Sequence, residues 1–255
     1  MSGAPDPVAR RDDQHHYSYR HYADAKVAAG FDDLRFGGPI GQFLLESQQA
    51  VLLEALAPVR GRRVLDVGTG TGRAAIGLAQ AGASVVGVDA SAEMLEVAAA
   101  RAKAAGVPVQ FERGDAHALP VGDRTVDAAV SLRVLMHTVD WRTCLAELCR
   151  VARWRVVVDF PALASFAALE SGTRRLAKAL GRNVEAYRVM AESDVASAFA
   201  ACGFRVVMIR RQFVLPIALH KAVGTLGFTR SVEGGLRRMG LLRLLGSPVT
   251  MVAER

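Results

Sequence analysis

An acidic residue and three glycines lie close together in the stretch Val64–Arg73, which reads VLDVGTGTGR. Asp66 ends a short apolar run, and the glycines alternate with threonines after it, at Gly68, Gly70 and Gly72. Glycine permits a tight turn and lets a ligand approach the bare backbone. A second acid, Asp89, ends the next apolar run, 21 residues after the first glycine. Carboxylates and free helix N–H groups at this spacing are suited to a ribose-bearing ligand.

Both acids can reach one ligand only if their strands end at the same edge of a sheet. Strands are expected at 63–68, 84–89, 108–115, 126–132 and 155–160, and helices at 71–82, 91–106 and 141–152. This alternation predicts an α/β fold with a Rossmann-like, doubly wound, mostly parallel sheet. Two later runs, 204–216 and 247–255, are expected to complete seven strands as an antiparallel pair that includes an edge strand.

The predicted organisation is a single large domain with additions at its N-terminal side. Residues 1–14 are polar and charged and are expected to be a disordered tail. Residues 15–58 are expected to form a helical N-terminal cap, and residues 59–255 the α/β domain. Within that domain, 161–202 and 216–246 are expected to contribute to a cap on the substrate side.

Composition and charge narrow the choice of compartment and partner. The three cysteines have no disulfide-framework spacing, no run is long enough to span a membrane, and the first residues lack a signal peptide's apolar segment, so a cytoplasmic location is expected. Residues 203–255 hold eight Arg and one Lys against two Glu, a surplus equal to the whole chain's net charge of +7. This basic end is weak support for nucleic acid, because the motifs of base-modifying enzymes are missing after the fourth strand.

Four consecutive motifs resemble the class I S-adenosylmethionine-dependent methyltransferases, and most of all the small-molecule branch that includes quinone-biosynthesis enzymes (methyltransferase type 11). They read VLDVGTGTGR, VVGVDAS, ERGDAHALP and VDAAVSLRVLMHTVDW. The resemblance implies S-adenosyl-L-methionine as the cofactor. The residues it implies for cofactor binding are Asp66, Gly68, Thr69, Gly70, Gly72, Asp89, Ala90, Met94, Asp115, Ala116, Ser131 and Leu132.

The same resemblance implies a part of the cofactor for each group of residues. Asp66 would orient the methionine amino group and Asp89 would accept from the ribose hydroxyls. Asp115 would accept from the adenine amino group, while Ala90 and Met94 would flank the ring. Ser131 and Leu132, where the fourth strand ends, would face the methionine portion and the sulfonium.

Residues near the reacting methyl group have both a catalytic and a structural interpretation. His137 follows the fourth strand and is either a general base or a helix-start histidine, and Arg133 either anchors an acidic substrate group or pairs with an acid at the rim. A lid over the cofactor, favoured by cation–π attraction, would use Tyr17, Tyr19, Tyr22 and Arg35; the alternative is plain packing and a turn. No metal is expected, because Ser131 stands where metal-dependent relatives need an acid.

The expected function is transfer of a methyl group to oxygen or carbon of a small, largely apolar organic molecule, such as a quinone precursor or a polyketide. The alternatives are an NAD(P)-dependent oxidoreductase and a non-catalytic cofactor-binding module of the same fold. The Leu- and Arg-rich segment 216–246 has two interpretations, contact with a membrane surface or an amphiphile, and a core-packing helix with a solvated Arg face. The sequence leaves the oligomeric state open.

Overall fold

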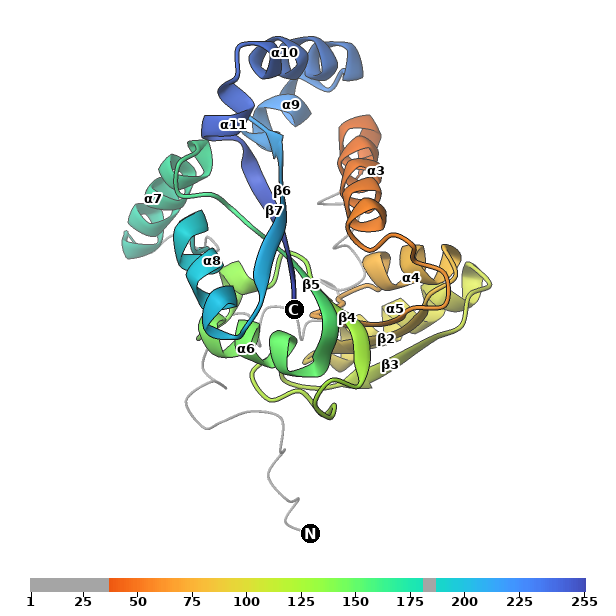
Figure 1. Ribbon diagram of the computed structural model, residues 1–255. Helices are drawn as coiled ribbons and strands as arrows, with labels where there is room; N and C mark the ends of the chain where they lie inside the picture. The colour runs from red at the N-terminus through yellow and green to blue at the C-terminus, as the bar shows by residue number, and fades with distance from the viewer. Residues whose placement is uncertain (1–36, 181–186) are drawn as a thin grey trace.

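A seven-stranded sheet forms the centre of the computed structural model, which describes residues 37–180, with the side chains of 176–179 excepted, and 187–255 (Figure 1). The strand order is β3-β2-β1-β4-β5-β7-β6. The strands are β1 Arg63–Val67, β2 Ser84–Asp89, β3 Val109–Arg113, β4 Val126–Ser131, β5 Ala152–Phe160, β6 Arg205–Phe213 and β7 Ser247–Glu254.

The predicted Rossmann-like, mostly parallel sheet is confirmed. Neighbours among β1 to β5 pair in parallel, whereas β7 is antiparallel to both β5 and β6. The antiparallel strand therefore lies one place in from the edge, and β6 is the edge strand. The chain order reverses between β1 and β4, and such a switch point opens a crevice at the carboxyl ends of the strands.

Helices cover both faces of the sheet. One buried cluster packs α3 (Gly38–Ala55) and α4 (Arg73–Gln80) on one face, and another packs α6 (Trp141–Val151) and α8 (Glu192–Ala201) on the other. The helix α5 (Ala92–Ala104) starts as its sequence predicts, because the Ser91 hydroxyl accepts from the Met94 N–H at 3.0 Å.

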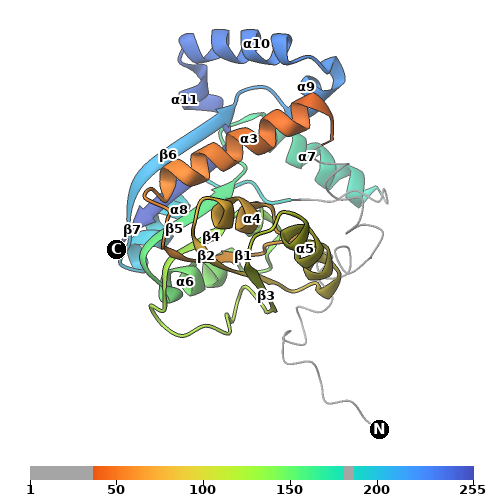
Figure 2. The ribbon, with the colours of Figure 1, turned by 90° about the vertical axis from the view of Figure 1, so that its right-hand side faces the viewer.

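The C-terminal part of the chain builds a second layer above the strand ends (Figure 2). It contains α7 (Phe166–Ala179), α9 (Ile217–Val223), α10 (Leu226–Arg238) and α11 (Leu241–Leu245). The carboxylate of Glu233 on α10 accepts from the N–H groups of Val214 and Leu215 at 2.9 and 3.0 Å, and its Oε1 lies 3.0 Å from Nε2 of the fully buried His220. These contacts fasten α10 to the turn after β6.

Several expectations lie outside the described residues or stay predictions. The tail 1–14 and the first part of the cap 15–58 lie outside them, so the division into tail, cap and domain stays a prediction. Among the residues that the structure describes, no helix combines the length and the apolar character needed to cross a bilayer.

Candidate functional site

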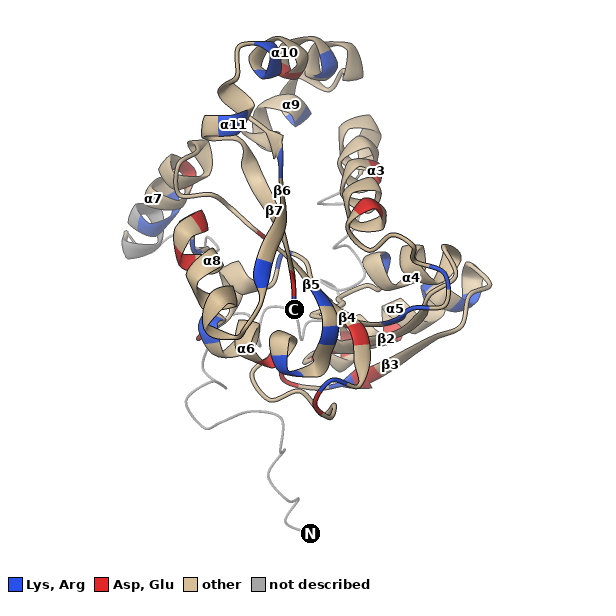
Figure 3. Ribbon diagram, in the orientation of Figure 1, with Lys and Arg blue, Asp and Glu red and all other residues tan. Residues whose placement is uncertain are grey.

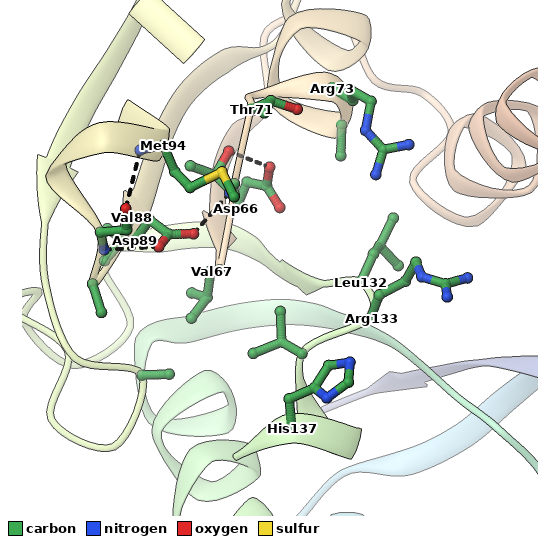
Figure 4. A pocket seen from close by; sticks show the side chains of 18 of the residues that line it. Asp66, Val67, Thr71, Arg73, Val88, Asp89, Met94, Leu132, Arg133 and His137 are labelled. Atoms are coloured by element: carbon green, nitrogen blue, oxygen red, sulfur yellow. Dashed lines mark hydrogen bonds between the residues drawn. The ribbon is translucent and has the colours of Figure 1, made fainter. Parts of the chain in front are cut away.

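A pocket of about 190 Å³ lies where β1, β2 and β4 end (Figure 4). Asp89 and Met94 lie on one side of it, and Arg133 and His137 lie on the other. The sequence placed Asp66 and Asp89 at the ends of neighbouring strands, and the parallel pairing of β1 with β2 brings both into this pocket.

The carboxylate of Asp89 organises the glycine-rich turn. Its Oδ2 accepts from the Gly70 N–H at 2.8 Å and its Oδ1 accepts from the Ser91 N–H at 3.0 Å. Burial raises the pKa of Asp89, although these backbone donors oppose the rise. Each carboxylate oxygen has a second lone pair, so Asp89 can still accept from a ligand.

Asp66 is the more deeply buried acid, with 2% of its surface exposed. Burial raises its pKa to about 6, against the effect of the Thr69 hydroxyl, which donates to Oδ2 at 2.7 Å. The neighbouring charge of Asp89 raises the pKa of Asp66 further. Two carboxylates that repel each other in one pocket favour a ligand that brings positive charge and hydroxyl donors.

The three glycines of the turn serve different purposes. A Cβ on Gly68 would lie 2.3 Å from a methyl group of Val134, whereas one on Gly70 would meet no atom of the described residues within 4 Å. A Cβ on Gly72 would lie 3.0 Å from Ala98 and 3.2 Å from Phe111, and Gly72 does not line the pocket. Gly72 therefore lets the turn pack against α5 and β3, and its expected contact with the cofactor stays a prediction.

Asp115 and Ser131 are absent from the lining of the pocket, and their expected contacts with the cofactor stay predictions. The carboxylate of Asp115 accepts from the N–H of His117 at 2.9 Å and lies 2.8 Å from its Nδ1, so Asp115 positions a histidine that does line the pocket. The fully buried Ser131 hydroxyl donates to the Val67 carbonyl at 3.0 Å and ties β4 to β1. In both residues an internal partner occupies the side chain.

A second cavity of about 460 Å³ adjoins the first one. The two share three lining residues, Gln48, Arg133 and His137. Walls of the second cavity come from 161–202 and 216–246, the segments expected to form the substrate-side cap, and include Phe166, Tyr187, Pro216 and Ile217. His137 is 8% exposed and belongs to the short helix η2 (Leu135–His137) just after β4.

Asp159, a further acid near a strand end, is not among the site residues expected from the sequence. Asp159 lies at the carboxyl end of β5, is 1% exposed and lines the second cavity. Its Oδ2 accepts from the Gln48 side chain at 3.0 Å, and its Oδ1 accepts from the backbone N–H of Arg133. Burial raises its pKa while the charge of Arg133 lowers it. The available signal was an acid closing an apolar run, the same pattern that identified Asp66 and Asp89.

Most of the residues expected to bind cofactor line the first pocket, and their roles stay predictions. These are Asp66, Gly68, Thr69, Gly70, Asp89, Ala90, Met94, Ala116 and Leu132. The residues expected to form a lid, Tyr17, Tyr19, Tyr22 and Arg35, lie outside the described residues. Within those residues, no three His, Cys, Asp or Glu side chains gather closely enough to hold a metal ion.

Some of the known proteins that match this chain cover only part of it, and others cover most of it. A family model described as a methyltransferase domain matches residues 64–154. The demethylmenaquinone methyltransferase of Clavibacter sepedonicus is 33% identical over 192 residues, which cover 68% of this chain and 78% of that protein. The O-methyltransferase cnsE of Penicillium expansum is 39% identical over 101 residues, and this chain spans only 37% of its length.

A solved structure shares the whole fold. The crystal structure of magnesium protoporphyrin IX methyltransferase from Synechocystis PCC 6803, with bound SAH, is similar with a TM-score of 0.64 and 19% identity. The match covers 96% of this chain and 97% of that one. The arrangement of strands and helices around the crevice is therefore common to both proteins.

Proposed function

This chain belongs to the class I S-adenosylmethionine-dependent methyltransferases, and from this premise we propose that it methylates an oxygen or carbon atom of a small, largely apolar organic molecule. One observation carries the proposal: a pocket at the strand ends that holds two carboxylates shares Gln48, Arg133 and His137 with a larger, mainly apolar cavity. A methyl donor in the first space and an acceptor in the second would meet at these three residues.

The lining of the first pocket fits the proposed cofactor. S-adenosylmethionine carries a positively charged sulfur with a reactive methyl group, an ammonium group and a ribose with two hydroxyls. Asp66 is proposed to face the ammonium group and Asp89 the ribose hydroxyls, because both carboxylates line the pocket. The open space beside Gly70 leaves the backbone accessible to the ligand.

Residues without a place in the pocket lining are proposed to support it from behind. Asp115 would act by holding His117, which lines the pocket, and Ser131 by holding the end of β1 through Val67. Gly72 would act by allowing the turn to pack against α5. Substitutions at these positions would change the shape of the site.

The residues at the junction are proposed to act on the acceptor. His137 is the candidate general base for a hydroxyl acceptor, a role that typically contributes about 10²–10⁴-fold to rate. Arg133 is proposed to hold an electron-rich part of the substrate, because it lines both spaces. Positioning of the two reactants with exclusion of water would supply much of the remaining acceleration.

The C-terminal helices are proposed to touch a membrane surface from which an apolar substrate is taken. Figure 3 shows Lys and Arg on α9, α10 and α11. Exposed apolar residues occur on or beside the same helices, namely Leu219, Val223, Met239 and Leu244, with 43%, 42%, 66% and 68% of their surface accessible. A basic surface with apolar side chains favours anionic lipid headgroups.

A cytoplasmic location also stays part of the proposal, supported by the free thiols of Cys144, Cys149 and Cys202.

Calorimetric titration of the full chain with S-adenosylhomocysteine and, separately, with NADH tests the proposed cofactor. We expect saturable 1:1 binding of S-adenosylhomocysteine and no comparable binding of NADH. Tight binding of NADH alone would support the oxidoreductase alternative. Binding of neither ligand by a folded chain would contradict the proposal.

A further inference from the structure

The face of the sheet beneath α3 changes character along its strands. In one cross-strand row Val157 pairs with Val252, which pairs with Met208, and all three belong to the apolar cluster beneath α3. The next row on the same face, two residues further along β5, is Asp159, Thr250 and Arg210. A polar floor therefore follows an apolar core where the sheet reaches the second cavity.

Contacts from α3 confirm that these polar residues share one face. The Gln48 side chain donates to Asp159, and Glu54 forms an ion pair with Arg210. Side chains two residues apart on a strand point to the same side of the sheet. Gln212 therefore lies on the same face as Arg210 and Asp159, and it lines the second cavity together with Asp159.

Asp159 offers a hydrogen-bond acceptor to a ligand in this cavity. Each oxygen of its carboxylate already accepts one hydrogen bond, from Gln48 and from the Arg133 backbone. A carboxylate oxygen has two lone-pair sites, so each can accept once more. Because Arg133 and Gln48 also line the first pocket, this acceptor lies beside the passage between the two spaces.

Gln212 offers the complementary group. Its side-chain nitrogen is buried and has no hydrogen-bond partner among the residues that the structure describes. An unsatisfied buried N–H group is costly, and a ligand that carries an acceptor oxygen removes that cost. The amide of Gln212 is therefore suited to a carbonyl oxygen, and its position on β6 places it away from the passage.

The spacing of the two groups sets the size of the ligand. Asp159 and Gln212 are separated by two strand spacings and one two-residue step, about 12 Å between Cα atoms from standard sheet dimensions. We propose that the second cavity binds an elongated, mainly apolar molecule with a hydroxyl group at the Asp159 end and a carbonyl oxygen at the Gln212 end. This inference rests on the proposed function and names the acceptor atom as the hydroxyl oxygen.

Three matched naphthalenes test the inference on the full chain saturated with S-adenosylhomocysteine. One carries a hydroxyl and an acetyl group at opposite ends, the second only the hydroxyl, and the third only the acetyl group. Binding is followed by naphthalene fluorescence in the wild type, in Asp159→Asn and in Gln212→Met. Thr250→Val is the matched control. Thr250 lies on β7, between β5 and β6, and pairs with Asp159, but it is 3% exposed and is absent from the lining of the cavity.

We expect the hydroxy ketone to bind the wild type about tenfold more tightly than either single-function analogue. Gln212→Met should abolish the advantage contributed by the acetyl group, Asp159→Asn the advantage contributed by the hydroxyl, and Thr250→Val neither. Equal affinity of the three probes for the wild type, or an unchanged acetyl advantage in Gln212→Met, would overturn the inference.

Titration of each variant with S-adenosylhomocysteine separates this result from the proposed function. If a variant loses selectivity among the probes but still binds S-adenosylhomocysteine, the substitution has changed the second cavity and has left the cofactor site intact. If Asp159→Asn fails to fold, Gln212→Met still decides the outcome, because the side-chain nitrogen of Gln212 makes no hydrogen bond to any described residue that the substitution could break.

Discussion

The buried carboxylate of Asp159 accepts a hydrogen bond from the backbone N–H of Arg133, a residue whose φ is +62°. The left-handed region is unfavourable for a residue with a Cβ. Asp159 on β5 thus holds the chain after β4 in a conformation that it would otherwise avoid. That conformation places Arg133 at the junction of the two cavities.

This backbone geometry predicts an unusual order of stability at position 133. Arg133→Gly should be more stable than Arg133→Ala by about 1 kcal/mol, because glycine adopts a positive φ without a steric penalty. Urea denaturation measures the difference. The same pair at Arg205, the first residue of β6, should show the opposite order, because glycine weakens strands. Equal stability of the two Arg133 variants would contradict the prediction.

Removal of the Asp89 charge should weaken cofactor binding. In Asp89→Asn we expect affinity for S-adenosylhomocysteine to fall by about 10–100-fold, because hydrogen bonds to a charged acceptor contribute about 1.5–3 kcal/mol. Calorimetric titration gives the affinity. Asp123→Asn is the control, because its side chain is 75% exposed and lies outside the pocket. Unchanged affinity in Asp89→Asn would remove Asp89 from the proposed contacts.

The ionised carboxylate of Asp66 should lower the folding stability of the cofactor-free protein, although it favours cofactor binding. Its pKa rises from 3.8 to about 6 on folding, so the folded state holds the proton more tightly than the unfolded state does. Ionisation therefore lowers stability as pH rises from about 4 to about 6, by up to about 3 kcal/mol, and the loss persists above that range. In Asp66→Asn this loss is absent.

Urea denaturation of the cofactor-free protein checks this sign. Asp66→Asn should be more stable than the wild type at pH 7.5, by up to about 3 kcal/mol, and the difference should shrink as the pH falls toward 4. The same substitution should weaken binding of S-adenosylhomocysteine at pH 7.5. A stability difference between Asp66→Asn and the wild type that stays constant from pH 4 to pH 7.5 would contradict a raised pKa for Asp66.

Gly68 and Gly70 should respond differently to alanine. Gly68→Ala should lower stability by about 1–3 kcal/mol beyond the backbone penalty, because its Cβ would lie 2.3 Å from a Val134 methyl. Gly70→Ala should cost only the backbone penalty, about 1–2 kcal/mol, and should weaken S-adenosylhomocysteine binding because Gly70 lines the pocket. Denaturation and titration of both variants test this. Adding Val134→Ala should restore stability to Gly68→Ala but not to Gly70→Ala.

The proposed membrane contact predicts a lipid-dependent association. The double variant Arg237→Ser and Arg238→Ser, at the exposed end of α10, should cosediment less with phosphatidylserine-containing vesicles, by roughly fivefold for each charge removed. Arg142→Ser with Arg153→Ser, on α6 and at the start of β5, is the charge-matched control. Equal losses in both double variants would indicate nonspecific attraction and contradict a dedicated contact at α10.

Local features of the sequence were sufficient to predict the order in which strands and helices follow one another along the chain. Apolar runs of strand length alternate with helical segments, and residues such as Ser91 at the start of α5 act through contacts within a few residues. The ends of β1 and β2 at Asp66 and Asp89 follow from the same runs. Parallel pairing then places both acids at one edge, so this half of the site was accessible from sequence alone.

Tertiary structure decided the parts that depend on register and on packing between distant segments. Gly72 packs against α5 and β3, and the carboxylate of Asp115 contacts His117. The sequence motifs alone assign both residues to cofactor binding, like the residues next to them. Asp159 and Gln212 are 53 positions apart in the sequence and share a cavity only because β7 inserts between β5 and β6 with one particular register. Composition and periodicity carry no information about that register, because it is set by the packing of the whole sheet against α3.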